Sequence, residues 1–199
     1  RDQSVDLVHA RSRAPAWSAY FAARRVGVPF ITTCHAPYNG RGRLKRFYNG
    51  IMGAGVRVIA ISNFVADYLR DVLKISNEKI RVVHRSVDVL RFHPDLVTPD
   101  RLIRMSARWR APDGATIVLL PARLTRWKGH RVLIEAMASL RNPNLFAVLQ
   151  GSDQGRHKYA RELLALVRKL GLEGQVRLVD HDPDLPAMYR AAHIIVSAS

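Results

Sequence analysis

The sequence predicts an α/β protein built on parallel sheets. Apolar runs alternate with amphipathic segments along most of its 199 residues, and only short polar loops separate them. The apolar runs are continuous, which is typical of parallel strands that are covered on both faces. Residues 91–99 contain two prolines and mixed polarity, so this segment is expected to be a linker between two such series.

Residues 1–90 form the first series. Its opening helix is expected to end at Gly27, because glycine readily adopts the left-handed conformation that often follows a helix. Ser62 precedes another helical pattern and suits an N-cap. We expect strands at residues 6–9, 28–34, 56–61 and 79–83, and helices at residues 14–26, 43–52 and 62–73.

Residues 115–199 form the second series, and the connecting region, residues 91–114, includes a basic helix. The chain stops at Ser199 without a closing helix, so we expect it to be a fragment of a longer protein. We expect helices at residues 100–109, from Gly129 to 140, 158–170 and 185–192, and strands at residues 117–120, 145–149, 176–179 and 194–196.

The chain carries a large excess of positive charge, with 32 Lys and Arg against 16 Asp and Glu and a formal net charge of +16. This excess predicts an anionic partner: nucleic acid, an anionic membrane surface or a phosphorylated substrate. The sequence has neither zinc-finger spacing nor an aromatic-interleaved ribonucleoprotein pattern, so specific binding of nucleic acid is the least favoured of the three. No apolar run approaches the roughly 18 residues that a membrane-spanning helix needs.

One stretch, TIVLLPARLTRWKG at residues 116–129, places two cations at a strand-to-helix turn. Arg123 follows the strand, and Lys128 comes five residues later at the start of a helical pattern. A guanidinium fork, an ammonium group and a helix N-terminus together suit a diphosphate. The alternative is an ordinary turn whose cations face solvent, and the spacing alone does not decide between them.

Six short segments of the sequence resemble the motifs of a known family. Pro121-Ala122-Arg123-Leu124 with Lys128-Gly129 is similar to a G-R-L…K-G signature. The other segments are Asp6–His9, Thr33–Pro37, Ala60–Ser62, Val82–Asp88 with Phe92 and Pro94, and Asp184–Ala192 with Ser197–Ser199. Taken in their order along nearly the whole chain, these segments resemble those of the family 4 glycosyltransferases, which have the GT-B fold.

The resemblance implies parts of two Rossmann-like domains with the active site in the cleft between them. Residues 1–90 would be the C-terminal part of the N-terminal, acceptor-side domain, and residues 115–199 the first part of the donor-binding domain. The implied reaction is retaining transfer of a sugar from a nucleotide-diphosphate sugar, usually without a metal and with no cofactor besides the donor substrate.

Particular residues match the family's functional positions. Arg123 and Lys128 would hold the donor diphosphate, and His35 would be the catalytic histidine that faces the donor sugar and phosphate. The alternative for His35 is a loop histidine bonded to backbone. Further residues expected to line the cleft are His9, Gly151, Asp180 and Leu185, although His9 could instead be structural and Gly151 only part of a turn.

Several positions depart from the family pattern. Ala122 stands where the signature has glycine, and Arg85-Ser86 replaces the usual Asn-Gly. The glycine-rich loop expected near the N-terminus is absent, and the pair of glutamates that holds the donor sugar would follow Ser199. The chain is therefore not expected to catalyse the reaction by itself.

The implied acceptor is a glycan or a lipid-linked molecule, such as a lipopolysaccharide or another cell-envelope glycan, handled in the cytoplasm. A basic amphipathic helix, with Arg41, Arg43 and Arg46 beside Leu44 and Phe47, could dock on an anionic membrane at its inner face. Equally, its apolar face could pack on the sheet. Two rival functions remain open, namely another GT-B nucleotide-sugar enzyme (an epimerase or phosphorylase) and a non-catalytic module that binds polyanions.

Overall fold

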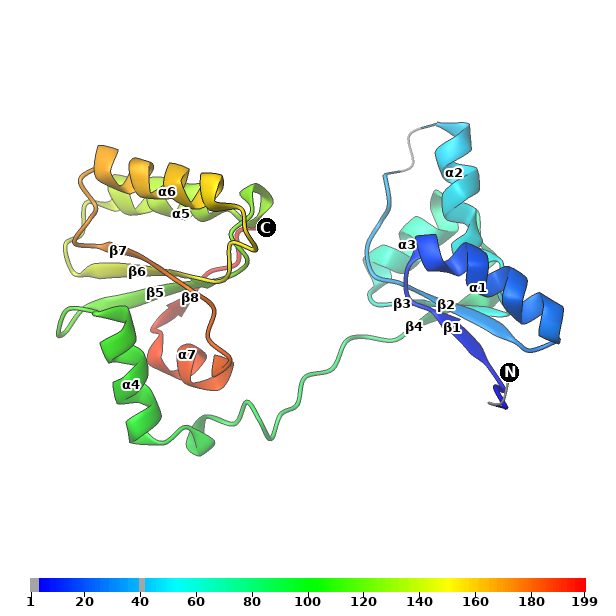
Figure 1. Cartoon of the computed structure of the whole chain (residues 1–199), viewed down its shortest axis with the longest axis horizontal. Coiled ribbons are helices and arrows are strands. Elements are labelled where there is room, and N and C mark those ends of the chain that lie inside the picture. The colour runs from blue at the N-terminus through cyan, green and yellow to red at the C-terminus, as the bar shows by residue number, and fades with distance from the viewer. Residues whose placement is uncertain (1–3, 40–41) are drawn as a thin grey trace. The chain divides into compact units, whose positions relative to one another are not determined.

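The computed structural model describes residues 4–39 and 42–199, so Arg41 lies outside the described residues. The chain divides into two units, residues 1–87 and residues 88–199 (Figure 1). Each unit contains one parallel sheet of four strands with helices between consecutive strands. The predicted α/β class with two parallel sheets is confirmed.

The first unit has its strands in sequential order, β1-β2-β3-β4, and all neighbouring pairs are parallel. Its strands are β1 (Val8–Ala10), β2 (Phe30–Cys34), β3 (Arg57–Ala60) and β4 (Ile80–Val82), and its helices are α1 (Arg13–Val26), α2 (Arg43–Gly50) and α3 (Asn63–Asp71), with 3₁₀ turns at Ile51–Gly53 and Asn77–Lys79.

Both helix boundaries predicted from single residues in this unit are confirmed. Gly27 ends α1 in the left-handed conformation, with φ 72°, and its N–H donates to the Ala23 carbonyl. The Ser62 hydroxyl accepts a hydrogen bond from the Val65 N–H at 3.3 Å, so it caps α3. The helix predicted from residue 43 is α-helical only to Gly50 and then tightens into a 3₁₀ turn.

The core of the first unit lies on one face of its sheet. Phe30, Cys34 and Val58 belong to a buried cluster that also contains residues of α1 and α3. Because successive residues of a strand point to opposite faces, Ile31 and Ile59 lie on the other face, where they are only half-buried. Thr33 on that face is nevertheless buried, so the prediction that continuously apolar strands are covered on both faces is only partly confirmed for the described part of this unit.

The second unit has the strand order β7-β6-β5-β8, again all parallel. Its strands are β5 (Thr116–Pro121), β6 (Leu145–Gln150), β7 (Val176–Val179) and β8 (Ile194–Ile195), and its helices are α4 (Pro99–Trp109), α5 (His130–Leu140), α6 (His157–Lys169) and α7 (Leu185–Ala191), with 3₁₀ turns at Pro94–Leu96 and Arg126–Lys128.

The second sheet is covered on both faces, as predicted (Figure 1). Val118 and Leu120 of β5 point into a cluster with α5 and α6, whereas Ile117 and Leu119 point into a second cluster with α4 and α7. Strand β6 alternates in the same way. The sheet is therefore the middle of three layers, and its two faces have separate cores.

Helix α4, which the sequence places in the connecting region, packs within the second unit. Trp109 at its end is fully buried, and its indole N–H donates to Gln150 Oε1 at 2.6 Å. Gln150 is the last residue of β6, and its amide N–H donates in turn to the Asp180 carbonyl at 3.3 Å. These two bonds satisfy a buried polar side chain at the carboxyl end of the sheet.

The carboxyl ends of β5 and β6 approach each other closely at Gly151. A Cβ at this position would lie 2.1 Å from the Ala122 carbonyl oxygen, which is closer than any side chain allows. The adjoining backbones are joined by hydrogen bonds from Ala122 N to Gln150 O at 3.0 Å and from Leu124 N to Ser152 O at 3.0 Å. Glycine at residue 151 therefore sets where the chain after β5 can lie.

Replacing Gly151 with alanine is expected to destabilise the second unit by about 1–3 kcal/mol, because the backbone must move to admit the methyl group. Chemical denaturation of the variant measures this loss. Gly174→Ala is the matched control, since nothing lies within 4 Å of a Cβ at Gly174. The control is expected to change stability by less than about 0.5 kcal/mol, and equal losses in both variants would contradict the steric explanation.

Candidate functional site

The strand order of the second sheet reverses next to β5. From β5 the chain adds β6 and β7 on one side, and then β8 returns to the other side of β5. In open parallel sheets, ligands bind beyond the carboxyl ends of the strands at such a reversal. The loop from Ala122 to Gly129 and residues 196–199 after β8 meet at this point.

Two adjacent cavities open at this edge of the sheet, and Pro121, Ala122 and Tyr189 line both. The larger cavity, about 400 Å³, lies over the ends of β5 and β6, and the smaller, about 180 Å³, lies over β5 and β8. Arg123, Gly151 and Leu185 line the larger cavity, and Lys128 and Ser199 line the smaller one.

The two predicted cations are available to a ligand. Arg123 is exposed, and among the described residues no side chain forms a hydrogen bond or ion pair with its guanidinium. The Lys128 ammonium donates to Ser199 Oγ at 3.2 Å and lies 4.0 Å from the centre of the Trp127 ring, but no carboxylate neutralises it in the part of the chain that the structure describes. By contrast, Arg126 forms an ion pair with Glu162 and lies over Tyr159.

The turn that carries Lys128 depends on Gly129. Residues 126–128 form a 3₁₀ turn, and Gly129 then adopts φ 74°, which places Lys128 just before the first turn of α5. A Cβ on Gly129 would lie 2.5 Å from the Ala198 carbonyl oxygen. Glycine is required here both for the backbone conformation and for the close approach of the chain after β8.

His130 lies directly beneath this turn and is not among the predicted site residues. Its side chain is fully buried, Nε2 lies 3.3 Å from the Ala122 carbonyl oxygen, and Nδ1 has no hydrogen-bond partner among the described residues. Burial lowers the pKa of His130, and the positive charge of Lys128 lowers it further. The neutral ring therefore supports the loop from below. The sequence feature that could have indicated a role for His130 is its position directly after Lys128-Gly129.

The loop from Asp180 to Leu185 is held by arginines of α4. Arg108 pairs with Asp182 at 2.6 Å and also donates to the His181 carbonyl at 3.2 Å. Arg101 binds both carboxylate oxygens of Asp184, which keeps the pKa of that carboxyl below its usual value. Through these contacts α4 positions the loop.

Of the two residues predicted in this loop, Leu185 lines the 400 Å³ cavity. Asp180 lines a neighbouring cavity of about 320 Å³ instead, together with Asp153 and His157. Gly151 lines both cavities.

The predicted histidines lie in the first unit. His35 directly follows β2 and is half-buried, and its Nδ1 lies 2.9 Å from Nη2 of Arg85 in the turn after β4. Burial lowers the pKa of His35, and the charges of Arg85 and Arg11 lower it further. His9 lies within β1 on the sheet face away from the helices, where its Nε2 is 2.8 Å from Thr33 Oγ1.

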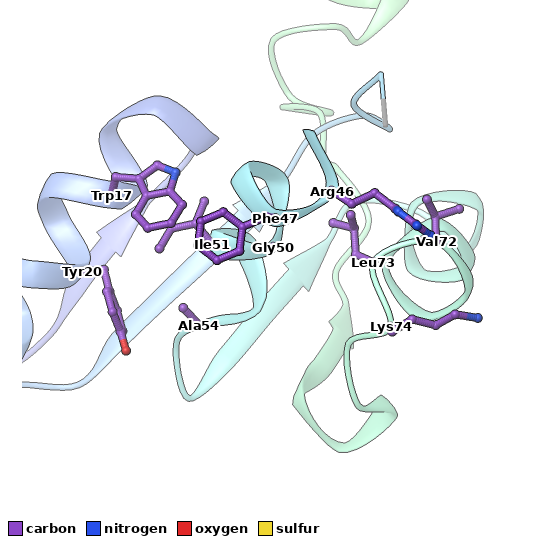
Figure 2. Close-up of a pocket in the computed structure, with 10 residues that line it drawn as sticks. All are labelled: Trp17, Tyr20, Arg46, Phe47, Gly50, Ile51, Ala54, Val72, Leu73 and Lys74. Atoms are coloured by element: carbon purple, nitrogen blue, oxygen red, sulfur yellow. The ribbon is translucent and has the colours of Figure 1, made fainter. Parts of the chain in front are cut away.

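A larger cavity of about 580 Å³ lies between the helices of the first unit (Figure 2). Figure 2 shows Trp17 of α1 and Phe47 of α2 beside each other in its wall, with ring centres 5.8 Å apart. Arg46 and Lys74 add positive charge to this mostly apolar lining. Helix α2 packs its aromatic residues on α1, and Leu44 and Phe47 remain 86% and 72% exposed.

Among residues 4–39 and 42–199, no helix has both the length and the apolar character needed to cross a bilayer.

Two family models match the chain. The model described as Glycosyltransferase Family 4 matches residues 1–91, and the model described as Glycosyl transferases group 1 matches residues 103–199. Together they leave only residues 92–102 unmatched. The chain belongs to the family 4 glycosyltransferases.

Individual relatives of the chain agree with this family assignment. The crystal structure of a glycosyltransferase from Rickettsia africae is 38% identical, with a TM-score of 0.87, over 98% of this chain and 52% of that chain. A D-inositol 3-phosphate glycosyltransferase from Salinispora tropica is 28% identical over 98% of this chain and 45% of its own length. HepE from Anabaena, solved in complex with UDP, is 21% identical, with a TM-score of 0.85, over 98% of this chain and 53% of that chain, and shows the shared fold. The chain thus spans about half the length of these relatives.

One departure from the signature of these glycosyltransferases has a structural explanation. Ala122 stands at the position of the usual glycine, and its carbonyl lies directly over Gly151. The close backbone approach at this edge is therefore met by the glycine directly after β6, so that a methyl group at residue 122 is tolerated.

The buried His130 predicts a pH dependence of stability. Its pKa is lower in the folded protein than the ordinary value of about 6.5, so the unfolded chain binds a proton more readily. The contribution of the neutral ring is present in full above about pH 6.5 and is lost as the pH falls below that value toward the folded-state pKa. Denaturant unfolding between pH 7 and pH 5 is therefore expected to give a shallower decline in stability for His130→Gln than for the unchanged protein.

The exposed His84 provides the control for this measurement. His84→Gln is expected to leave the decline as it is in the unchanged protein. A decline that is equally steep with and without His130 would show that another group causes it.

Proposed function

We propose that the protein transfers a sugar from a nucleoside-diphosphate sugar to an acceptor, with retention of configuration at the anomeric carbon. The observation that carries this proposal is a pair of cations, Arg123 and Lys128, which no carboxylate among the described residues neutralises. They lie beside adjoining cavities where the strand order of the second sheet reverses. Membership of the family supplies the reaction class, and the two side chains supply a chemical means of carrying it out.

Negative charge accumulates on the diphosphate as the bond between the sugar and phosphate breaks. Fixed cations stabilise this developing charge more than they stabilise the intact donor, so they lower the barrier. Removing one such contact typically costs about 2–4 kcal/mol of transition-state stabilisation. Arg123 can bind two phosphate oxygens through its planar fork, whereas Lys128 acts as a point charge at the beginning of α5.

The remaining roles are assigned on the same basis. We assign the nucleoside to the 400 Å³ cavity, where Leu185 and the loop held by α4 form one wall. His35 is assigned to the donor sugar, on the family resemblance and its place at a strand end. No cofactor besides the donor is proposed. The acceptor is proposed to be a glycan or a lipid-linked molecule, and the relative named D-inositol 3-phosphate glycosyltransferase makes a phosphorylated polyol worth testing as well.

Binding of UDP tests the diphosphate site, and UDP is the ligand named for HepE. Thermal unfolding of the full-length protein is expected to show stabilisation by UDP. Arg123→Ala and Lys128→Ala are each expected to weaken binding at least about tenfold, because a hydrogen bond to a charged group contributes about 1.5–3 kcal/mol. Most of the thermal shift should then be lost at moderate UDP concentrations.

Arg131→Ala is the matched control. It removes the same charge from an exposed side chain of α5 that already pairs with Glu135 at 2.8 Å. The control is expected to keep the full thermal shift. An undiminished shift in both Arg123→Ala and Lys128→Ala would remove the diphosphate assignment, and GDP should be tested in parallel because the base is not assigned.

A membrane surface is proposed as a further partner, supported by the exposure of Leu44 and Phe47 beside Arg43, Lys45 and Arg46 on α2. Apolar side chains can enter the interface of a bilayer while neighbouring cations contact anionic headgroups. The cavity lined by Trp17 and Phe47 adds apolar surface on the same side of α2.

Co-sedimentation with vesicles tests this partner. The full-length protein is expected to bind vesicles that contain phosphatidylglycerol and not vesicles of phosphatidylcholine alone. Arg46→Ala is expected to weaken binding about fivefold, since one cation near an anionic surface contributes about 1 kcal/mol, and Phe47→Ala should weaken it as well. Phe64→Ala, which changes an aromatic residue that is 71% exposed on α3, is the control. Equal binding to both kinds of vesicle, or to neither, would refute the proposal.

A further inference from the structure

The turn after β4 brings an arginine to the predicted catalytic histidine. Arg85 and His35 are 50 residues apart in sequence, and their side chains meet because β2, β3 and β4 are in register. Cys34 pairs with Ala60, and Ala60 pairs with Val82, so the residues that follow β2 and β4 leave the same edge of the sheet. Arg85 Nη2 lies 2.9 Å from His35 Nδ1.

This contact determines which ring nitrogen carries the proton. A guanidinium remains protonated and has donors but no acceptor, so Nδ1 of His35 must accept the hydrogen bond through its lone pair. The proton of the neutral ring is then on Nε2. A doubly protonated ring would direct an N–H at the guanidinium and could not keep this bond.

The charges around His35 favour the same state. Arg85, Arg11 and His9 are the titratable or charged groups that act on its ring, and each disfavours a second proton. Within the described ranges, no carboxylate pairs with either arginine. A positively charged imidazole is therefore disfavoured by its surroundings as well as by the geometry of the bond.

We propose that Arg85 is a positioning residue that holds His35 as the neutral ring with its proton on Nε2. His35 then offers a fixed hydrogen-bond donor to an oxygen atom of the substrate, and it serves neither as a general base through Nε2 nor as a cation. This role rests on the proposed function in one respect, the assignment of His35 to the donor sugar. The charge that sets it is a property of this chain, because Arg85-Ser86 stands where the family signature has Asn-Gly.

Nuclear magnetic resonance of the full-length protein labelled with ¹⁵N in its histidine rings tests the proposal. The shifts of the two ring nitrogens identify the protonated one, and His35→Gln assigns the signals by removing them. In the unchanged protein, His35 is expected to show the Nε2–H form and to take up its second proton below about pH 6.5. In Arg85→Ala, the two neutral forms should mix and the pKa should rise toward about 6.5, whereas Arg85→Lys should keep the Nε2–H form because lysine also donates only.

Arg57→Ala is the control, because it removes the same charge from an exposed β3 side chain whose one hydrogen bond among the described residues is to the Val56 carbonyl. It is expected to leave the His35 signals unchanged. A proton on Nδ1 in the unchanged protein, or equal changes in Arg85→Ala and Arg57→Ala, would overturn the proposal. The measurement needs neither the sugar donor nor the sugar acceptor. Failure of UDP binding would therefore refute the proposed function, and the protonation state of His35 could still be determined independently.

Discussion

Two backbone contacts that leave no room for a side chain organise the carboxyl edge of the second sheet. Gly151 lies under the Ala122 carbonyl, and Gly129 lies against Ala198. The first contact fixes the chain that leaves β5, and the second fixes the chain that leaves β8. Arg123 and Lys128 are carried by the segment between these two points, so their positions follow from backbone packing more than from any interaction of their own side chains.

The strongly basic composition is resolved by the structure into cations with different roles. Arg101, Arg108 and Arg126 are paired with Asp184, Asp182 and Glu162, and the first two hold a loop in place. Arg123 and Lys128 have no such partner among the described residues and remain free to meet an anion. An excess of charge along a sequence therefore says less about function than the pattern of which charges are left unneutralised at a strand end.

The sequence was sufficient for most of the elements and for the strand-to-helix turn that carries Arg123 and Lys128, because periodicity, Gly27 and Ser62 are local signals that the structure bears out. It was insufficient wherever distant segments meet. The contact between Arg85 and His35, the bond between Trp109 and Gln150 and the burial of His130 join residues that have no common local pattern. The sequence also did not predict the half-buried face of the first sheet. The residue pattern of an apolar strand is the same whether or not a layer of helices covers each of its sides.

The alternation of β5 between two separate cores has a consequence for how this region can change. Val118 and Leu120 serve one core, and Ile117 and Leu119 serve the other. Deleting or inserting a single residue in β5 would exchange the side chains that face the two cores. Arg123, which follows the strand, would then lie on the opposite side of the sheet. Among homologous chains, substitutions in this strand should therefore be common between apolar residues, whereas changes in its length should be rare and confined to the loops at its ends.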